Sequence, residues 1–127
     1  MKLRCTENSI RIRIRKSELD QLAQTKRVEE KVRFGNQVVL TFALSINETI
    51  QQVAATLLDN NLVVSLPKSA ANEWINSNQV GIEVNKETGD DQNLHILIEK
   101  DFPCLDRENE DKSDTFWELA SDTPDAC

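Results

Sequence analysis

A run of arginines that alternates with isoleucines is the part of this sequence whose residue types and spacing best suit binding chemistry. In the segment Ile10–Arg15, isoleucine stands at every even position and arginine at every odd one. Side chains of a strand point alternately to its two faces, so this pattern predicts one apolar face and one basic face. Guanidinium groups bind phosphates and carboxylates, and two further cations alternate in the same way downstream. The candidate anion-binding residues are Arg11, Arg13, Arg15, Lys31 and Arg33.

Two interpretations of this basic face remain open from the residues alone. The first makes it the water-facing side of a sheet whose other side is core, which is the usual distribution of charged residues. The second makes it the lining of a barrel that holds a polyanion, where carboxylates would also bind a divalent metal. The residues that would share such a lining are Glu29, Glu83, Glu99 and His95.

A metal site is a third hypothesis, and it rests on Cys104 and the acidic residues that follow it. The three cysteines are widely spaced and form no CxxC pair, which argues against a zinc site or a disulfide framework. Thiolate and carboxylate ligands together suit no common metal well. The acidic run also lacks the glycine and the final glutamate of an EF-hand. A half-buried Cys104 and a solvated acidic tail are therefore favoured, and no cofactor is expected.

The charge is unevenly distributed along the chain. The net charge is −7, but residues 1–35 carry ten Lys/Arg against five Asp/Glu, whereas residues 101–127 carry two against nine. The acidic end argues against nucleic acid as a partner, because phosphate neutralisation dominates that kind of binding. We find no signal peptide and no apolar stretch long enough to span a membrane, so we expect a cytoplasmic protein without a membrane partner.

A duplication organises the rest of the chain. Residues 8–34 and 60–86 show the same succession of apolar positions fifty-two residues apart, with Lys16-Ser17 repeated as Lys68-Ser69 and Leu22 replaced by Trp74. In both segments the apolar period changes from two to helical spacing and back to two, which predicts a helix between strands. Ser17 is the expected N-cap of the first helix. The predicted strands are 1–5, 10–15, 28–34, 38–44, 49–58, 62–66, 80–84 and 94–98, and the predicted helices are 17–25 and 69–74.

These elements predict an α+β fold built from a duplicated strand–strand–helix–strand–strand unit. We expect one domain over residues 1–105, with pseudo-repeats at 1–45 and 46–100, and eight mostly antiparallel short strands with two short helices. Because an open sheet leaves two costly edges, a barrel or half-barrel is the natural arrangement. Residues 106–127 are acidic and lose the periodicity, so we expect them to be a tail that is largely loop or disordered. An apolar cluster in this tail is a candidate partner-binding segment, formed by Phe116, Trp117 and Leu119.

The sequence resembles an uncharacterised family of small bacterial proteins, a domain of unknown function, over nearly its whole length. The motifs that carry the resemblance are Asn8-Ser9-Ile10-Arg11 with Lys16-Ser17-Glu18, Val28-Glu29-Glu30 with Phe34-Gly35, Trp74 with Val80-Gly81, and Glu99–Leu105 with Glu110–Asp114. The resemblance implies a cytoplasmic bacterial protein and no particular activity. The chain departs from the family pattern at Trp117-Glu118-Leu119, where a Pro-Asn-like ending is expected. A weaker, fold-level similarity links the duplicated unit to triphosphate tunnel enzymes, although no predicted strand carries their Glu-x-Glu-x-Lys pattern.

We therefore expect a small accessory or regulatory protein that binds a protein partner and is not an enzyme. The partner is an unidentified protein, or a second copy of the chain in a homodimer. The alternative is a polyanion-binding or phosphohydrolase-like barrel that uses the arginine strand. Metal binding through Cys104 and the acidic tail is the third hypothesis.

Overall fold

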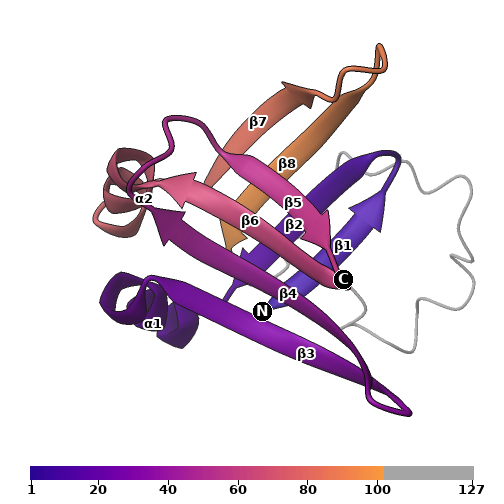
Figure 1. The fold of residues 1–127 in the computed structure, drawn as a ribbon. Coiled ribbons are helices and arrows are strands. Elements are labelled where there is room, and N and C mark those ends of the chain that lie inside the picture. Colours follow the sequence, from indigo (N-terminus) through magenta and orange to yellow (C-terminus); the bar gives the residue numbers. More distant parts are fainter. Residues whose placement is uncertain (102–127) are drawn as a thin grey trace, which may run out of the picture.

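A computed structural model of the chain describes residues 1–101, which form two four-stranded sheets and two helices (Figure 1). Cys104, Phe116, Trp117, Leu119 and the rest of the predicted acidic tail lie outside the described residues. In chain order the elements are β1 (Lys2–Thr6), β2 (Ser9–Ile14), α1 (Lys16–Thr25), β3 (Arg27–Gly35), β4 (Val38–Asn47), β5 (Ala54–Leu58), β6 (Asn61–Pro67), α2 (Lys68–Ile75), β7 (Gly81–Glu87) and β8 (Asn93–Lys100). The predicted α+β class, with eight short strands and two short helices, is confirmed.

The two halves of the chain exchange hairpins to build the sheets. The first sheet has the order β1-β2-β8-β7 and the second has the order β3-β4-β6-β5, so each sheet takes one hairpin from each half. Within a sheet the two hairpins are joined by a parallel pair, β2 with β8 or β4 with β6, while the other four pairs are antiparallel. Moving every strand to its counterpart in the other half converts one sheet order into the other. The duplication is therefore a pseudo-twofold relation between the sheets.

The tight turns repeat at the same spacing as the strands. Glu7 and Asn8 join β1 to β2, while Asp59 and Asn60 join β5 to β6, and all four residues have positive φ between 48° and 63°. Two successive residues with positive φ give the turn whose twist matches that of a two-stranded hairpin. Asn and Asp tolerate this conformation better than most residues.

The helices lie at the same end of the molecule in Figure 1 and cover the core there. The predicted N-cap of the first helix was wrong, because α1 begins at Lys16 and Arg15 occupies the cap position. The backbone N–H of Arg15 donates to Glu18 Oε1 at 2.9 Å, and this acidic side chain satisfies the helix end without help from Ser17. No helix in residues 1–101 has the length and apolar character needed to cross a membrane.

One of the predicted strands was too long. Residues 49–58 were expected to be extended, but β5 begins only at Ala54. The side chain of Asn47 accepts hydrogen bonds from the backbone N–H and the hydroxyl of Thr49, at 2.9 Å and 2.7 Å. These bonds turn the chain away from β4, because an asparagine side chain can imitate a backbone turn.

Of the two arrangements expected, barrel or half-barrel, the closed barrel is not found, because the sheets do not close within the described residues. No pairing joins the edge strands β1 and β7 of one sheet to the edge strands β3 and β5 of the other. The sheets instead enclose a shared core, whose largest fully buried side chains are Trp74, Ile12, Ile14, Leu22, Leu44, Leu66, Ile96, Ile98 and Val64. Charged residues such as Arg4 and Lys31 stand on the edge strands, which discourages pairing with other chains.

Trp74 is the best test of this core. It is fully buried in α2, at the position that Leu22 occupies in α1, and its Nε1 donates to the carbonyl of Val80 at 3.1 Å. We expect Trp74→Ala to lower the free energy of unfolding by about 3–5 kcal/mol, because the cavity cannot close fully. Urea unfolding measures the change. The control is Leu57→Ala on β5, a residue that is 72% exposed, which should cost less than about 0.5 kcal/mol. Equal losses would contradict the shared core.

Candidate functional site

The basic side of the first sheet is built by the register of β1 and β2. Lys2 stands opposite Arg13 and Arg4 stands opposite Arg11, on the side away from the buried isoleucines of β2. We call these four residues the arginine face. Like charges directly across an antiparallel pair destabilise it, so two such pairs in succession need negative charge nearby.

Glu99 supplies part of that charge from the opposite end of the chain. The parallel pairing of β2 with β8 places it beside Arg13, and its Oε1 accepts from the Nε groups of Arg11 at 2.5 Å and of Arg13 at 3.0 Å. Glu99 is only 7% exposed. Burial by itself raises the pKa of this carboxyl, but hydrogen bonds and charge from the two arginines outweigh burial and lower the pKa below its ordinary value.

A second acid–base pair lies on the same side of the first sheet. The Nε2 of His95 is 2.6 Å from Glu83 Oε1, and both side chains are substantially exposed. Catalytic histidines act beside a nucleophile or a substrate proton. The hydrogen-bond partner of this histidine in the described structure is an exposed carboxylate, so the pair has the character of a surface strand contact.

The structure divides the five predicted anion-binding residues among separate places. Arg11 and Arg13 meet at Glu99, while Arg15 is exposed at the start of α1. Lys31 and Arg33 belong to β3 in the other sheet, and Lys31 lies 4.0 Å from Glu29. The arginine strand and these two downstream cations therefore belong to different sheets. Glu29 likewise stands on β3 in the second sheet, whereas Glu83 and Glu99 stand on β7 and β8 in the first.

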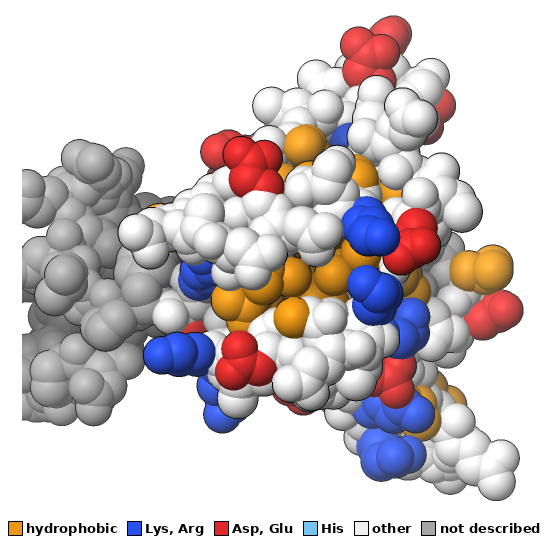
Figure 2. Space-filling view, turned by 90° about the vertical axis from the view of Figure 1, so that its left-hand side faces the viewer, with side chains coloured by type: hydrophobic (Ala, Val, Ile, Leu, Met, Phe, Trp, Pro, Cys, Tyr) orange, Lys and Arg blue, Asp and Glu red, His pale blue; other side chains and the backbone are white. Residues whose placement is uncertain are grey.

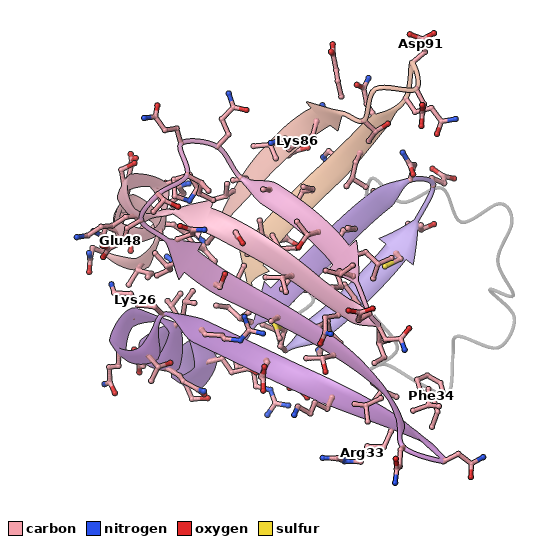
Figure 3. All side chains as sticks on the ribbon, viewed as in Figure 1. Lys26, Arg33, Phe34, Glu48, Lys86 and Asp91 are labelled. Atoms are coloured by element: carbon pink, nitrogen blue, oxygen red, sulfur yellow. The ribbon has the colours of Figure 1, made fainter. Side chains whose placement is uncertain are left out.

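The sequence reasoning missed an apolar surface on the β3–β4 hairpin. Val32, Phe34 and Val38 are 42%, 66% and 49% exposed, although all three are large and hydrophobic. Phe34 falls where the register shifts between Arg33 and Gly35, and such a bulge redirects side chains. Figure 3 shows Phe34 and Arg33 on opposite sides of the hairpin tip. The missed signal was that apolar residues continue at even-numbered positions of the strand, at Val28, Val32 and Phe34. This pattern extends beyond the part of the strand that the core can cover.

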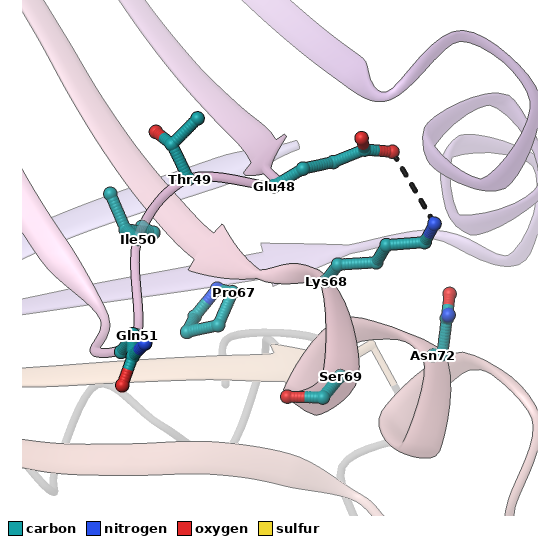
Figure 4. Close-up of a pocket in the computed structure, with 8 residues that line it drawn as sticks. All are labelled: Glu48, Thr49, Ile50, Gln51, Pro67, Lys68, Ser69 and Asn72. Atoms are coloured by element: carbon teal, nitrogen blue, oxygen red, sulfur yellow. Dashed lines mark ion pairs between the residues drawn. The ribbon is translucent and has the colours of Figure 1, made fainter.

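Two pockets occupy equivalent positions in the repeats, each where a parallel strand pair meets the start of a helix. The larger has a volume of about 550 Å³ and includes Lys68, whose Nζ lies 3.5 Å from Glu48 Oε1 (Figure 4). The smaller, of about 300 Å³, includes Lys16 and Asp101. Figure 2 views the helix end of the molecule and shows exposed hydrophobic groups ringed by charged ones. The Glu48–Lys68 pair is more than half exposed, so the larger pocket is a solvated surface depression.

Residues 1–101 contain no cluster of three or more His, Cys, Asp or Glu side chains that could hold a metal ion. The hypothesis of metal binding through Cys104 concerns residues outside this range. Cys5, the free cysteine of the described part, is exposed on β1.

The chain belongs to the family of unknown function DUF7009, which it matches over residues 1–119. No curated protein and no solved structure matches the chain. The expected membership of an uncharacterised family is thus confirmed, and no evidence was found for similarity to triphosphate tunnel proteins.

The shared carboxylate should make the stability of the domain depend on pH. We expect Glu99→Gln to lower the free energy of unfolding at neutral pH by about 1–3 kcal/mol, because two arginines lose their common acceptor. The pKa of Glu99 is lower in the folded protein than its ordinary value of 4.5. Its ionised form therefore stabilises the fold above that pH, and the contribution declines as the pH falls through the lowered pKa.

Urea unfolding of both proteins across the acidic range tests this dependence, and the difference between their free energies of unfolding should narrow as the pH falls through the lowered pKa of Glu99. The matched control is Glu87→Gln, which removes the same charge from an exposed position on β7. It should change the free energy of unfolding by less than about 0.5 kcal/mol at any pH. A gap of constant size for Glu99→Gln would mean that the carboxylate contributes by its shape rather than by its charge.

Proposed function

We propose that this chain is a small accessory or regulatory protein of the bacterial cytoplasm that acts by binding a protein partner through its β3–β4 hairpin. The exposed apolar group on that hairpin carries the proposal. Phe34 is 66% exposed in a domain with a well-formed core, and large apolar side chains gathered on a surface are typical of interaction sites.

The hairpin projects past its neighbours in the second sheet. Strand β6 pairs with β4 only from Thr41 onward, whereas β3 and β4 continue to pair with each other from Val32 opposite Leu40 to Gly35 opposite Val38. Figure 1 shows this hairpin extending beyond the body of the sheet. A projecting hairpin presents its side chains on both faces, so a partner can reach Val32, Phe34 and Val38 without disturbing the core.

The charge around the hairpin indicates what such a partner looks like. Lys31 and Arg33 alternate with Val32 on β3, so they stand on the other face of the same hairpin, and both are exposed where a partner that wraps around the tip can reach them. An apolar partner segment flanked by acidic residues would match this surface, because charge complementarity guides and orients association. Aromatic and arginine side chains are also the residues that most often dominate binding energy at protein interfaces.

We infer binding rather than catalysis because the two candidate acid–base groups on this side of the first sheet, Glu99 and His95, are each engaged with another side chain. Glu99 is held by two arginines, and His95 contacts an exposed carboxylate. A polyanion-binding function is the second candidate, and the opposed pair Arg4 and Arg11 favours it. Metal binding remains the third hypothesis, through residues beyond position 101.

Site-specific photo-crosslinking tests the hairpin as a partner surface. We expect a photoreactive phenylalanine analogue at position 34 to give one dominant protein adduct in the native cell. In the same protein, Val32→Ser combined with Val38→Ser should reduce the adduct by about five-fold or more, because central apolar contacts each contribute on the order of 1 kcal/mol or more. Mass spectrometry of the adduct identifies the partner.

The matched control places the analogue at Thr56, an exposed residue of β5 in the same sheet. That position should give no dominant adduct. Identical adducts at both positions, or none at position 34, would overturn the proposed surface. An adduct of twice the mass of the chain would replace the external partner by a second copy and make the protein a homodimer.

A further inference from the structure

The arginine face carries more positive charge than the described residues neutralise. It brings four cations together. The ion pairs found for them among residues 1–101 are with Glu99, which accepts from Arg11 and Arg13, and with Asp101, whose Oδ2 lies 3.4 Å from Lys2 Nζ. Glu83, on the far strand of the same side, is engaged with His95. Arg4 is exposed and has no ion pair within residues 1–101, although it stands directly opposite Arg11.

This surplus of positive charge lies at an open edge of the first sheet. Strand β1 pairs only with β2 among the described strands, so its outer backbone edge has no strand beside it. Lys2 and Arg4 are two residues apart on β1, and side chains at that spacing lie on one face about 7 Å apart. An anionic chain with carboxylates at alternate positions would therefore match the charges along this edge.

The chain itself carries such a run of acids. Asp106, Glu108 and Glu110 stand at alternate positions, and Asp106 is only five positions beyond Asp101. Asp101 is already beside Lys2 at the start of β1. Five residues span at most about 17 Å, and β1 itself is about 14 Å long, so these acids can reach any part of the arginine face.

We propose that the acidic segment 106–110 of this chain binds its own arginine face, with its carboxylates compensating Arg4 and Arg11. The short connection gives the segment a high effective concentration at the face, so weak ion pairs suffice to hold it there. A separate anion must displace the segment to occupy the same surface. The proposal concerns the first sheet and does not depend on the β3–β4 hairpin of the second sheet.

Zero-length crosslinking of the full chain tests this contact. A carbodiimide joins an amine to a carboxylate in direct contact, and we expect mass spectrometry to find Lys2 joined to Asp106, Glu108 or Glu110. High salt should suppress these products, because the Debye length falls to about 3 Å at 1 M. Arg4→Gln with Arg11→Gln should reduce their yield by about five-fold or more, since each exposed ion pair contributes up to about 1 kcal/mol.

The matched control removes two arginines from the other sheet by Arg27→Gln with Arg33→Gln and should leave the yield unchanged. Arg4→Gln alone, at an exposed position, keeps the test valid if the double variant unfolds. Equal losses in both double variants, or no product between Lys2 and residues 106–110, would overturn the proposal. A mixture of isotopically heavy and light chains distinguishes binding by the segment of the same chain from binding by the segment of a second copy. Crosslinked products that combine both isotopes would show that a second copy occupies the face.

Discussion

The two parallel pairings between the halves of the chain are the constraint on which the rest of the structure depends. Strand β2 joins β8 and strand β4 joins β6, and these contacts hold each sheet together at its centre. Neither half has a complete sheet of its own, because its two hairpins belong to different sheets. A hairpin alone is marginally stable in water. The repeats therefore cannot act as independent domains, and the core that they share forms only when both are in place.

The same exchange creates the arginine face. Arg11 and Glu99 are eighty-eight positions apart in the chain, yet the β2–β8 pairing brings Arg11 Nε within 2.5 Å of Glu99 Oε1. The second sheet has the equivalent pairing but lacks the charges, since Val63 and Ser65 stand on β6 at the positions that correspond to Arg11 and Arg13. The central strands have thus diverged, because the charged residues on the corresponding face of the second sheet, Arg27, Glu29 and Lys31, stand on the edge strand β3. The duplication explains the architecture, whereas the differences between the repeats carry whatever is specific to function.

The periodicity of the sequence predicted the elements of this fold but not their neighbours. Alternation states which residues share a face of a strand, and it correctly separated Ile10, Ile12 and Ile14 from the arginines. It contains no information about which strand lies alongside, so Lys31 and Arg33 were expected beside Arg11 when they belong to the other sheet. The burial of Glu99 was hidden for the same reason, because its partners come from β2. Phe34 was treated as a strand residue, since only the paired lengths of β3, β4 and β6 reveal that the hairpin projects.

The two exposed features of the domain place different demands on their surroundings. The hairpin group Val32, Phe34 and Val38 lies on strands that are already paired with each other, so it can remain exposed in the free protein at the cost of apolar contact with water. The arginine face has opposed like charges whose repulsion acts in the folded domain itself. The hairpin therefore does not need a partner in order to fold. Negative charge near Arg4 and Arg11, in contrast, contributes directly to the stability of the first sheet. Because β2 in that sheet also pairs with β8, charge at the arginine face acts on the strand pairing that unites the two halves.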